Sequence, residues 1–117
     1  MYEKQQIGKL GEDLATKYLK EKNYKIVGKN FHCRQGEIDI IAEQDNELIF
    51  VEVKTRTNLH YGRPAEAVTK TKQKHIAKAT EYYLYKNKLE NNKVRIDVIE
   101  IYIHNGKYKI NHVKQAM

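Results

Sequence analysis

The chain has 117 residues, 40% hydrophobic and 32% charged, which is enough for one domain with a modest core and too apolar for a disordered protein. Its formal net charge of +7 favours an anionic partner, of which nucleic acid is the commonest, although an ordinary soluble basic protein has the same composition. The lack of a long apolar run and of a signal-like N-terminus predicts no membrane span and a cytoplasmic location. The single cysteine, Cys33, excludes an internal disulfide and a cysteine-based zinc site.

Residues 3–22 are predicted to form a helix, because apolar residues recur there at spacings of three and four. Gly8 and Gly11 are costly inside a helix, which indicates close approach of another backbone. Glu12 falls at the edge of the apolar stripe and could lean into a site, or simply reach water. Asp13 falls on the far side and is expected to be solvated.

Three strands are expected next. The first covers residues 24–33, with a bulge or bend at Gly28. The second and third cover residues 36–42 and 48–54, which are rich in Ile, Val and Phe. Between them, Asp45-Asn46 suits a two-residue hairpin turn, because both residues tolerate positive φ.

That turn would pair residues whose numbers add to 91, so Asp39 and Glu52 would face each other with their Cβ atoms roughly 5 Å apart. Lys54 would point to the same side, two residues beyond Glu52. Burying two such carboxylates is unfavourable unless a positive charge lies between them. A divalent cation with oxygen ligands could occupy that position. The alternative is that all three side chains are solvated on a polar face of the hairpin. The apolar residues around Glu52 and the direct opposition of like charges argue for the buried cation site.

The loop after this hairpin is polar and basic. Arg56 and Arg63 could contact phosphates and Tyr61 could stack on a base or sugar, or the segment is a mobile connector.

A second helix lies within residues 65–87, with Thr69 as its N-cap. Its lysines, with Lys70 and Lys72 nearest the loop, are expected to contact nucleic acid, or else form a soluble face; Lys72 is unusual in falling inside the apolar stripe. The expected buried stripe is Val68, His75, Ile76, Ala79, Tyr82 and Tyr83. Two further strands, 94–103 and 108–113, flank an Asn105-Gly106 turn.

The order of helix, three strands, helix and two strands predicts a single-domain α/β sandwich over residues 1–117, with a mixed central sheet and flanking helices. With Asp39 on one strand and Glu52-Val53-Lys54 on the next, the chain resembles the αβββαβ core of the PD-(D/E)XK nuclease superfamily. Asp39 stands in Gly36-Glu37-Ile38-Asp39, which is similar to the corresponding motif of archaeal Holliday-junction resolvases. The sequence as a whole most resembles the bacterial YraN-like family. The matching segments are Gly11-Glu12, Tyr18-Leu19, residues 36–42, residues 50–56, residues 62–68, Lys72-Gln73 and residues 95–98.

The resemblance implies a restriction-endonuclease-like fold and Mg²⁺- or Mn²⁺-dependent cleavage of phosphodiester bonds in DNA, branched or structured DNA included. Asp39, Glu52 and the Val53 carbonyl would hold the metal, and Lys54 would orient or activate water. Glu12 would add a carboxylate, and Gln73 matches a polar residue often found near the site. By analogy, a homodimer would cut both strands. The alternative function is a nucleic-acid-binding protein that keeps the fold without turnover, and a role in protein interaction is a third hypothesis.

Overall fold

The computed structural model describes residues 4–57 and 68–117. The elements in this part of the chain follow the predicted order. They are α1 (Lys4–Glu21), β1 (Lys25–Cys33), β2 (Gly36–Gln44), β3 (Glu47–Arg56), α2 (Lys70–Lys86), β4 (Lys93–His104) and β5 (Lys107–Val113).

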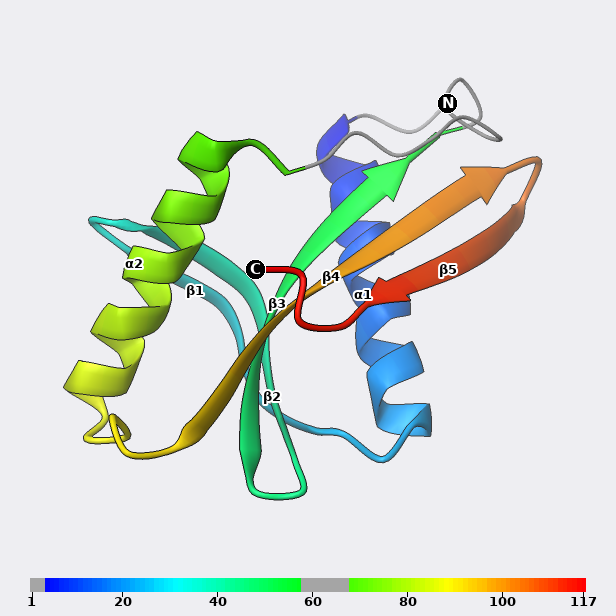
Figure 1. Ribbon diagram of the computed structural model, residues 1–117. Helices are drawn as coiled ribbons and strands as arrows, with labels where there is room; N and C mark the ends of the chain where they lie inside the picture. Colours follow the sequence, from blue (N-terminus) through cyan, green and yellow to red (C-terminus); the bar gives the residue numbers. More distant parts are fainter. Residues whose placement is uncertain (1–3, 58–67) are drawn as a thin grey trace.

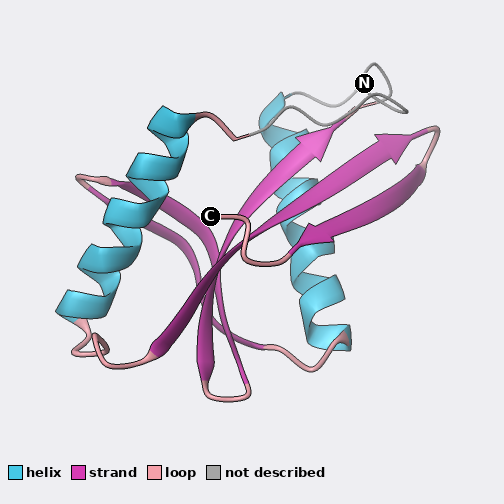
Figure 2. Ribbon diagram, in the orientation of Figure 1, coloured by secondary structure: helices cyan, strands magenta, loops and turns pink. Residues whose placement is uncertain are grey.

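The five strands form one mixed sheet in the order β1-β2-β3-β4-β5, in which β3 and β4 are parallel and every other pair is antiparallel. The two helices cover opposite faces of this twisted sheet (Figure 1). Figure 2 shows the resulting arrangement of helix, sheet and helix, which confirms the predicted α/β sandwich. Neither described helix has the length and apolar character of a membrane span.

The turn chemistry fixes the central hairpin as predicted. Asp45 and Asn46 adopt φ values of 52° and 63°, as a two-residue turn with two left-handed residues requires. Ile40 therefore pairs with Val51, in the register whose residue numbers add to 91. The Asn105-Gly106 turn closes β4 and β5 in the same way.

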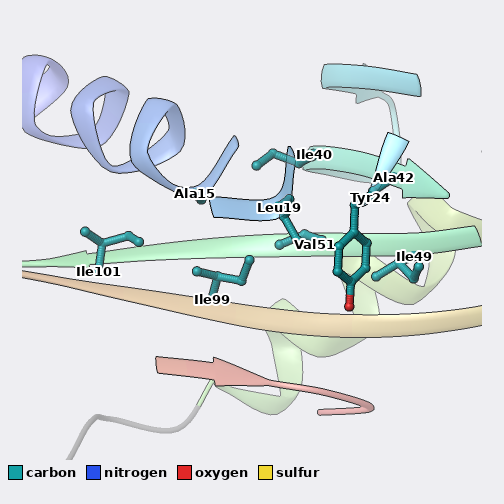
Figure 3. Close-up of a cluster of buried hydrophobic side chains, with 9 residues drawn as sticks. All are labelled: Ala15, Leu19, Tyr24, Ile40, Ala42, Ile49, Val51, Ile99 and Ile101. Carbon is teal, nitrogen blue, oxygen red and sulfur yellow. The ribbon is translucent and has the colours of Figure 1, made fainter. Parts of the chain in front are cut away.

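Two apolar clusters hold the layers together, one on each face of the sheet. The cluster beneath α1 is drawn in Figure 3 and contains Ala15, Leu19, Tyr24, Ile40, Ala42, Ile49, Val51, Ile99 and Ile101. The cluster beneath α2 contains Ile38, Ile41, Leu48, Phe50, Ile76 and Ala79.

The predicted stripe of the second helix was wrong for His75 and Tyr82, which are exposed. The prediction is confirmed for Ile76 and Ala79, which the helix buries together with Thr80. These three residues point at the sheet and leave His75 and Tyr82 on the side of the helix. The Thr69 N-cap is confirmed, because its side chain accepts a hydrogen bond from the Lys72 N–H.

Strands β1 and β2 twist sharply together near Asp39. Ile40 packs in the α1 cluster, whereas Ile38, two residues earlier on the same strand, packs in the α2 cluster. In a regular strand these residues would share a face. On β1, Asn30 has a φ of 53°, and the β1–β2 ladder skips Asn30 and Asp39. The irregularity therefore falls where the candidate acidic site begins.

Candidate active site

Asp39 and Glu52 meet where the β2–β3 ladder stops. The last pair of the ladder is Ile40–Val51, and one residue further out the Asp39 Oδ2 accepts a hydrogen bond of 2.7 Å from the Val53 N–H. Glu52 lies beside Asp39, with its side chain only 5% exposed. The hairpin register thus brings the two carboxylates together in a largely dry place.

Burial shifts both acids toward their protonated forms. Burial, and then the Asp39 carboxylate, raise the pKa of Glu52 to about 7, against the opposing effect of Lys72 and Lys54. Burial also raises the pKa of Asp39, although the Val53 N–H offsets part of that effect. A hydrogen bond between the two carboxyl groups, formed when one of them is protonated, further lowers the pKa of Asp39 and raises that of Glu52. The Glu52 Oε2 atom is buried without a hydrogen-bond partner among the described residues, an arrangement that costs free energy unless a cation or a donor reaches it.

Two lysines from different elements approach the other oxygen of Glu52. Its Oε1 lies 3.9 Å from the Lys54 Nζ and 3.6 Å from the Lys72 Nζ. Lys72 lies on the inner side of α2, within the apolar stripe, and its side chain extends to this carboxylate. The Glu52 carboxylate therefore explains why a lysine occupies a position in the stripe. Both ammonium groups remain partly exposed, so they can also face an anion in the opening.

Glu12 lines the same opening from α1. The pocket has a volume of about 480 Å³, and its lining includes Glu12, Asp39, Glu52, Lys54 and Lys72. Burial, and then the nearby Asp39, raise the pKa of the Glu12 carboxyl. Helix and sheet meet closely here. A Cβ at the neighbouring Gly11 would overlap the Thr55 hydroxyl oxygen and lie 3.0 Å from the Thr55 Cβ. The predicted close approach of another backbone is not what the structure shows: Gly11 lies against the Thr55 side chain, and Gly8 has open space around it.

The remaining predicted site residues are placed differently. Gln73 is not among the described residues that line the pocket, and its side-chain amide donates to the Val68 carbonyl. Arg56 is 15% exposed, with its Nη2 atom 3.9 Å from the Glu100 Oε2, so it packs on the sheet. Lys70 is exposed at the start of α2. The two predicted nucleic-acid contacts Tyr61 and Arg63 lie outside the described residues.

The donor atoms suit a magnesium ion better than a transition metal. In residues 4–57 and 68–117, no group of three or more His, Cys, Asp or Glu side chains is arranged to hold a metal by itself. Mg²⁺ takes one or two carboxylates from a protein and completes its shell with water and substrate phosphate. Asp39 and Glu52 supply two such carboxylates, and the Oε2 of Glu52, which accepts no hydrogen bond from residues 4–57 and 68–117, is the oxygen that would bind such an ion.

A second polar cluster, missed by the sequence analysis, lies on the α1 side of the sheet. Asp97 is fully buried, and its carboxylate accepts from the Arg95 side chain at 2.8 and 3.0 Å and from the Gln115 N–H at 3.0 Å. The His112 Nε2 lies 2.7 Å from the same carboxylate, and the His112 Nδ1 lies 3.0 Å from the Tyr18 hydroxyl. Although burial alone would raise it, these hydrogen bonds hold the pKa of Asp97 below its ordinary value. The i, i+2 spacing of Arg95 and Asp97 on one strand was the available signal.

A family model described as "Uncharacterised protein family UPF0102" matches residues 11–101. The chain belongs to this family. UPF0102 is the YraN family, so the predicted family membership is confirmed. A UPF0102 protein of Caldicellulosiruptor saccharolyticus is 44% identical over 115 residues, which cover 97% of this chain and 98% of the relative. One from Clostridium perfringens is 48% identical over 112 residues, which cover 94% and 92% of the two chains.

A solved structure entitled "Crystal structure of SSO0001" aligns with a TM-score of 0.33 and 16% identity, over 94% of this chain and 50% of that one. A TM-score this low does not establish a shared fold.

Proposed function

We propose that this UPF0102 protein is a metal-dependent nuclease that hydrolyses phosphodiester bonds in DNA. The observation that carries the proposal is the buried Asp39–Glu52 pair, in which one oxygen of Glu52 faces two lysines and the other has no hydrogen-bond partner among the described residues. Without a bound cation, burying such a pair lowers the stability of the fold. Carboxyl groups with shifted pKa values that line a pocket are typical of functional sites.

Asp39 and Glu52, with the Val53 carbonyl, would hold Mg²⁺ or Mn²⁺. When bound there, the ion supplies Lewis-acid polarisation of the phosphate and offsets the charge that builds up on its oxygens. Lys72 and Lys54 stand on the pocket side of Glu52, where their ammonium groups can bind a phosphate oxygen.

The reaction in this proposal is a hydrolysis. An oxygen from water forms a bond to phosphorus, the bond from phosphorus to the leaving nucleotide oxygen breaks, and that oxygen takes up a proton. Lys54 orients the attacking water, as its place beside Glu52 allows. Glu12 lines the pocket with a raised pKa, which suits it to accept the proton that the water loses.

The test is cleavage of linear duplex, nicked, single-stranded and four-way DNA by purified protein with Mg²⁺ or Mn²⁺. We expect the wild type to cut at least one of these substrates. Asp39→Asn and Glu52→Gln should each reduce the rate by a factor of at least about 100, since each removes a carboxylate that the proposed metal site needs.

Asp13→Asn is the matched control, because Asp13 is an exposed carboxylate next to Glu12 that pairs with Lys9 and Lys29 at the surface. It should cut like the wild type. Cleavage that survives both site substitutions, or no cleavage of any substrate with either metal, would overturn the proposal.

A further inference from the structure

The exposed side of α2 carries several basic and aromatic side chains and one acidic side chain, that of Glu81. Residues four apart lie one above another along a helix. On α2 this spacing makes neighbours of Lys70, Lys74, Lys78, Tyr82 and Lys86, all of which are exposed, in a row that winds from the outer side of the helix to the side next to β1. Tyr85 lies three residues beyond Tyr82. We call these six residues the basic ridge. Glu81, the acidic residue of the helix, lies among them, three residues after Lys78 and four before Tyr85.

The two tyrosines of the ridge are more exposed than core packing explains. Tyr85 is 69% exposed. Tyr82 is also exposed on one side, and its ring stacks on Phe31 of β1 with centroids 6.3 Å apart and an interplanar angle of 30°. Phe31 thus holds the Tyr82 ring in place. Lysines alone would keep the helix soluble, and exposed tyrosines add a flat surface on which a base can stack.

Two residues of α2 outside the basic ridge, Lys72 and His75, border the acidic site. A pocket of about 310 Å³ lies between the β1–β2 turn and α2, and His32, Lys72 and His75 are among its lining residues. It shares Glu37 and Lys72 with the pocket that holds the carboxylates. His75 directly follows Lys74 of the ridge, so a strand that leaves the ridge at Lys74 can reach the carboxylate site past His75 and Lys72.

We infer that the basic ridge binds a single-stranded segment of DNA, with backbone phosphates on its lysines and bases on Tyr82 and Tyr85. A duplex keeps its bases stacked on one another, so an exposed tyrosine ring is useful only for an unpaired strand. The inference rests on the proposed function for what happens at the carboxylates, and it narrows the substrate to DNA with an unpaired segment next to the bond that is cut. The binding step itself requires neither a metal nor cleavage.

The test is fluorescence anisotropy in EDTA with a labelled 20-nucleotide oligo-dT and a 20-base-pair duplex. The wild type should bind the single strand more tightly. Tyr85→Ala should weaken that binding about tenfold, and Tyr85→Phe should restore it because the ring is kept. Lys74→Gln with Lys78→Gln should reduce the slope of log affinity against log salt by about 1.4, since each lysine neutralises one phosphate.

The matched control lies on β5, where Tyr108 is 48% exposed between the exposed Lys107 and Lys109. The control variant combines Tyr108→Ala with Lys107→Gln and Lys109→Gln. It removes the same charge and an exposed ring, and it should leave oligo-dT binding within about twofold of the wild type. An equal loss in this control and in the Lys74, Lys78 and Tyr85 triple variant would overturn the inference, as would tighter binding of the duplex.

The two proposals fail separately. Asp39→Asn with Glu52→Gln should keep oligo-dT binding in EDTA, because neither residue belongs to the basic ridge. If oligo-dT binds through the ridge but no DNA is cut, the nuclease proposal fails and the inference stands. If DNA is cut and the ridge variants neither bind nor cut less well than the wild type, the inference fails and the nuclease proposal stands.

Discussion

Glu52→Gln should stabilise the metal-free protein above neutral pH. The folded state raises the pKa of Glu52 from its ordinary value of 4.5 to about 7, through burial and the Asp39 carboxylate. Between these two values the folded protein holds more protons than the unfolded chain, so this group's contribution to stability falls as pH rises through the window. At about 1.4 kcal/mol for each pH unit, the full penalty above pH 7 is about 3 kcal/mol. Glutamine carries no charge, so the Glu52→Gln variant does not incur this loss of stability.

The assay is urea denaturation in EDTA at intervals from pH 4.5 to 8.5. Wild type and Glu52→Gln should differ little near pH 4.5, and the variant should be more stable by about 3 kcal/mol at pH 8. Adding Mg²⁺ at pH 8 should stabilise the wild type and leave Glu52→Gln unchanged, because a cation that binds the folded state needs the ionised carboxylate. A variant no more stable than the wild type at pH 8 would show that Glu52 is not penalised for its charge, and the reasoning about this site would fail.

Gly11→Ala should destabilise the fold by about 2 kcal/mol in urea denaturation, because the added methyl group overlaps the Thr55 side chain on β3. Gly8→Ala has open space around it and should stabilise the fold by about 1 kcal/mol through helix propensity. Equal effects of the two substitutions would contradict the close packing at Gly11. Asp97→Asn should cost about 3 kcal/mol at pH 7, because it removes the fully buried carboxylate that pairs with Arg95 and leaves the guanidinium only its 3.3 Å ion pair with Glu47. The exposed Asp13→Asn should change stability little, and a mild Asp97→Asn variant would show that the buried cluster is not held by charge.

Local chemistry made the central hairpin predictable. Asp45 and Asn46 accept the left-handed backbone that a two-residue turn needs, and a two-residue turn leaves one register for the strands that follow. That register places Asp39 and Glu52 directly beyond its last pair, Ile40–Val51, which is why the meeting of the two carboxylates could be predicted. The pattern of Lys72 inside an apolar stripe also pointed to its role, because a lysine on the inner side of a helix needs an anion to reach.

Contacts across the parallel β3–β4 pair could not be predicted in the same way. No turn fixes the register of two strands joined through a helix, so the sequence does not state which residues face each other there. Arg56 was predicted as a phosphate contact, and the β4 residue Glu100 lies 3.9 Å from it instead. The Asp97 cluster depends further on β5, which brings His112 from the far end of the chain.

The twist at Asn30 and Asp39 explains why the two carboxylates are not equivalent. Where the ladder breaks off, the Val53 N–H turns to the Asp39 carboxylate and favours its ionised form, whereas the Oε2 of Glu52 receives no such donor from the described residues. With its pKa near 7, Glu52 is the member of the pair that holds a proton in mildly acidic solution. The pair then carries one negative charge that Lys54 and Lys72 can balance. Ionising Glu52 as well lowers the stability of the fold, and a bound cation would offset that loss. A sheet built for stability alone would place an apolar residue at position 52, like Phe50 and Val51 before it.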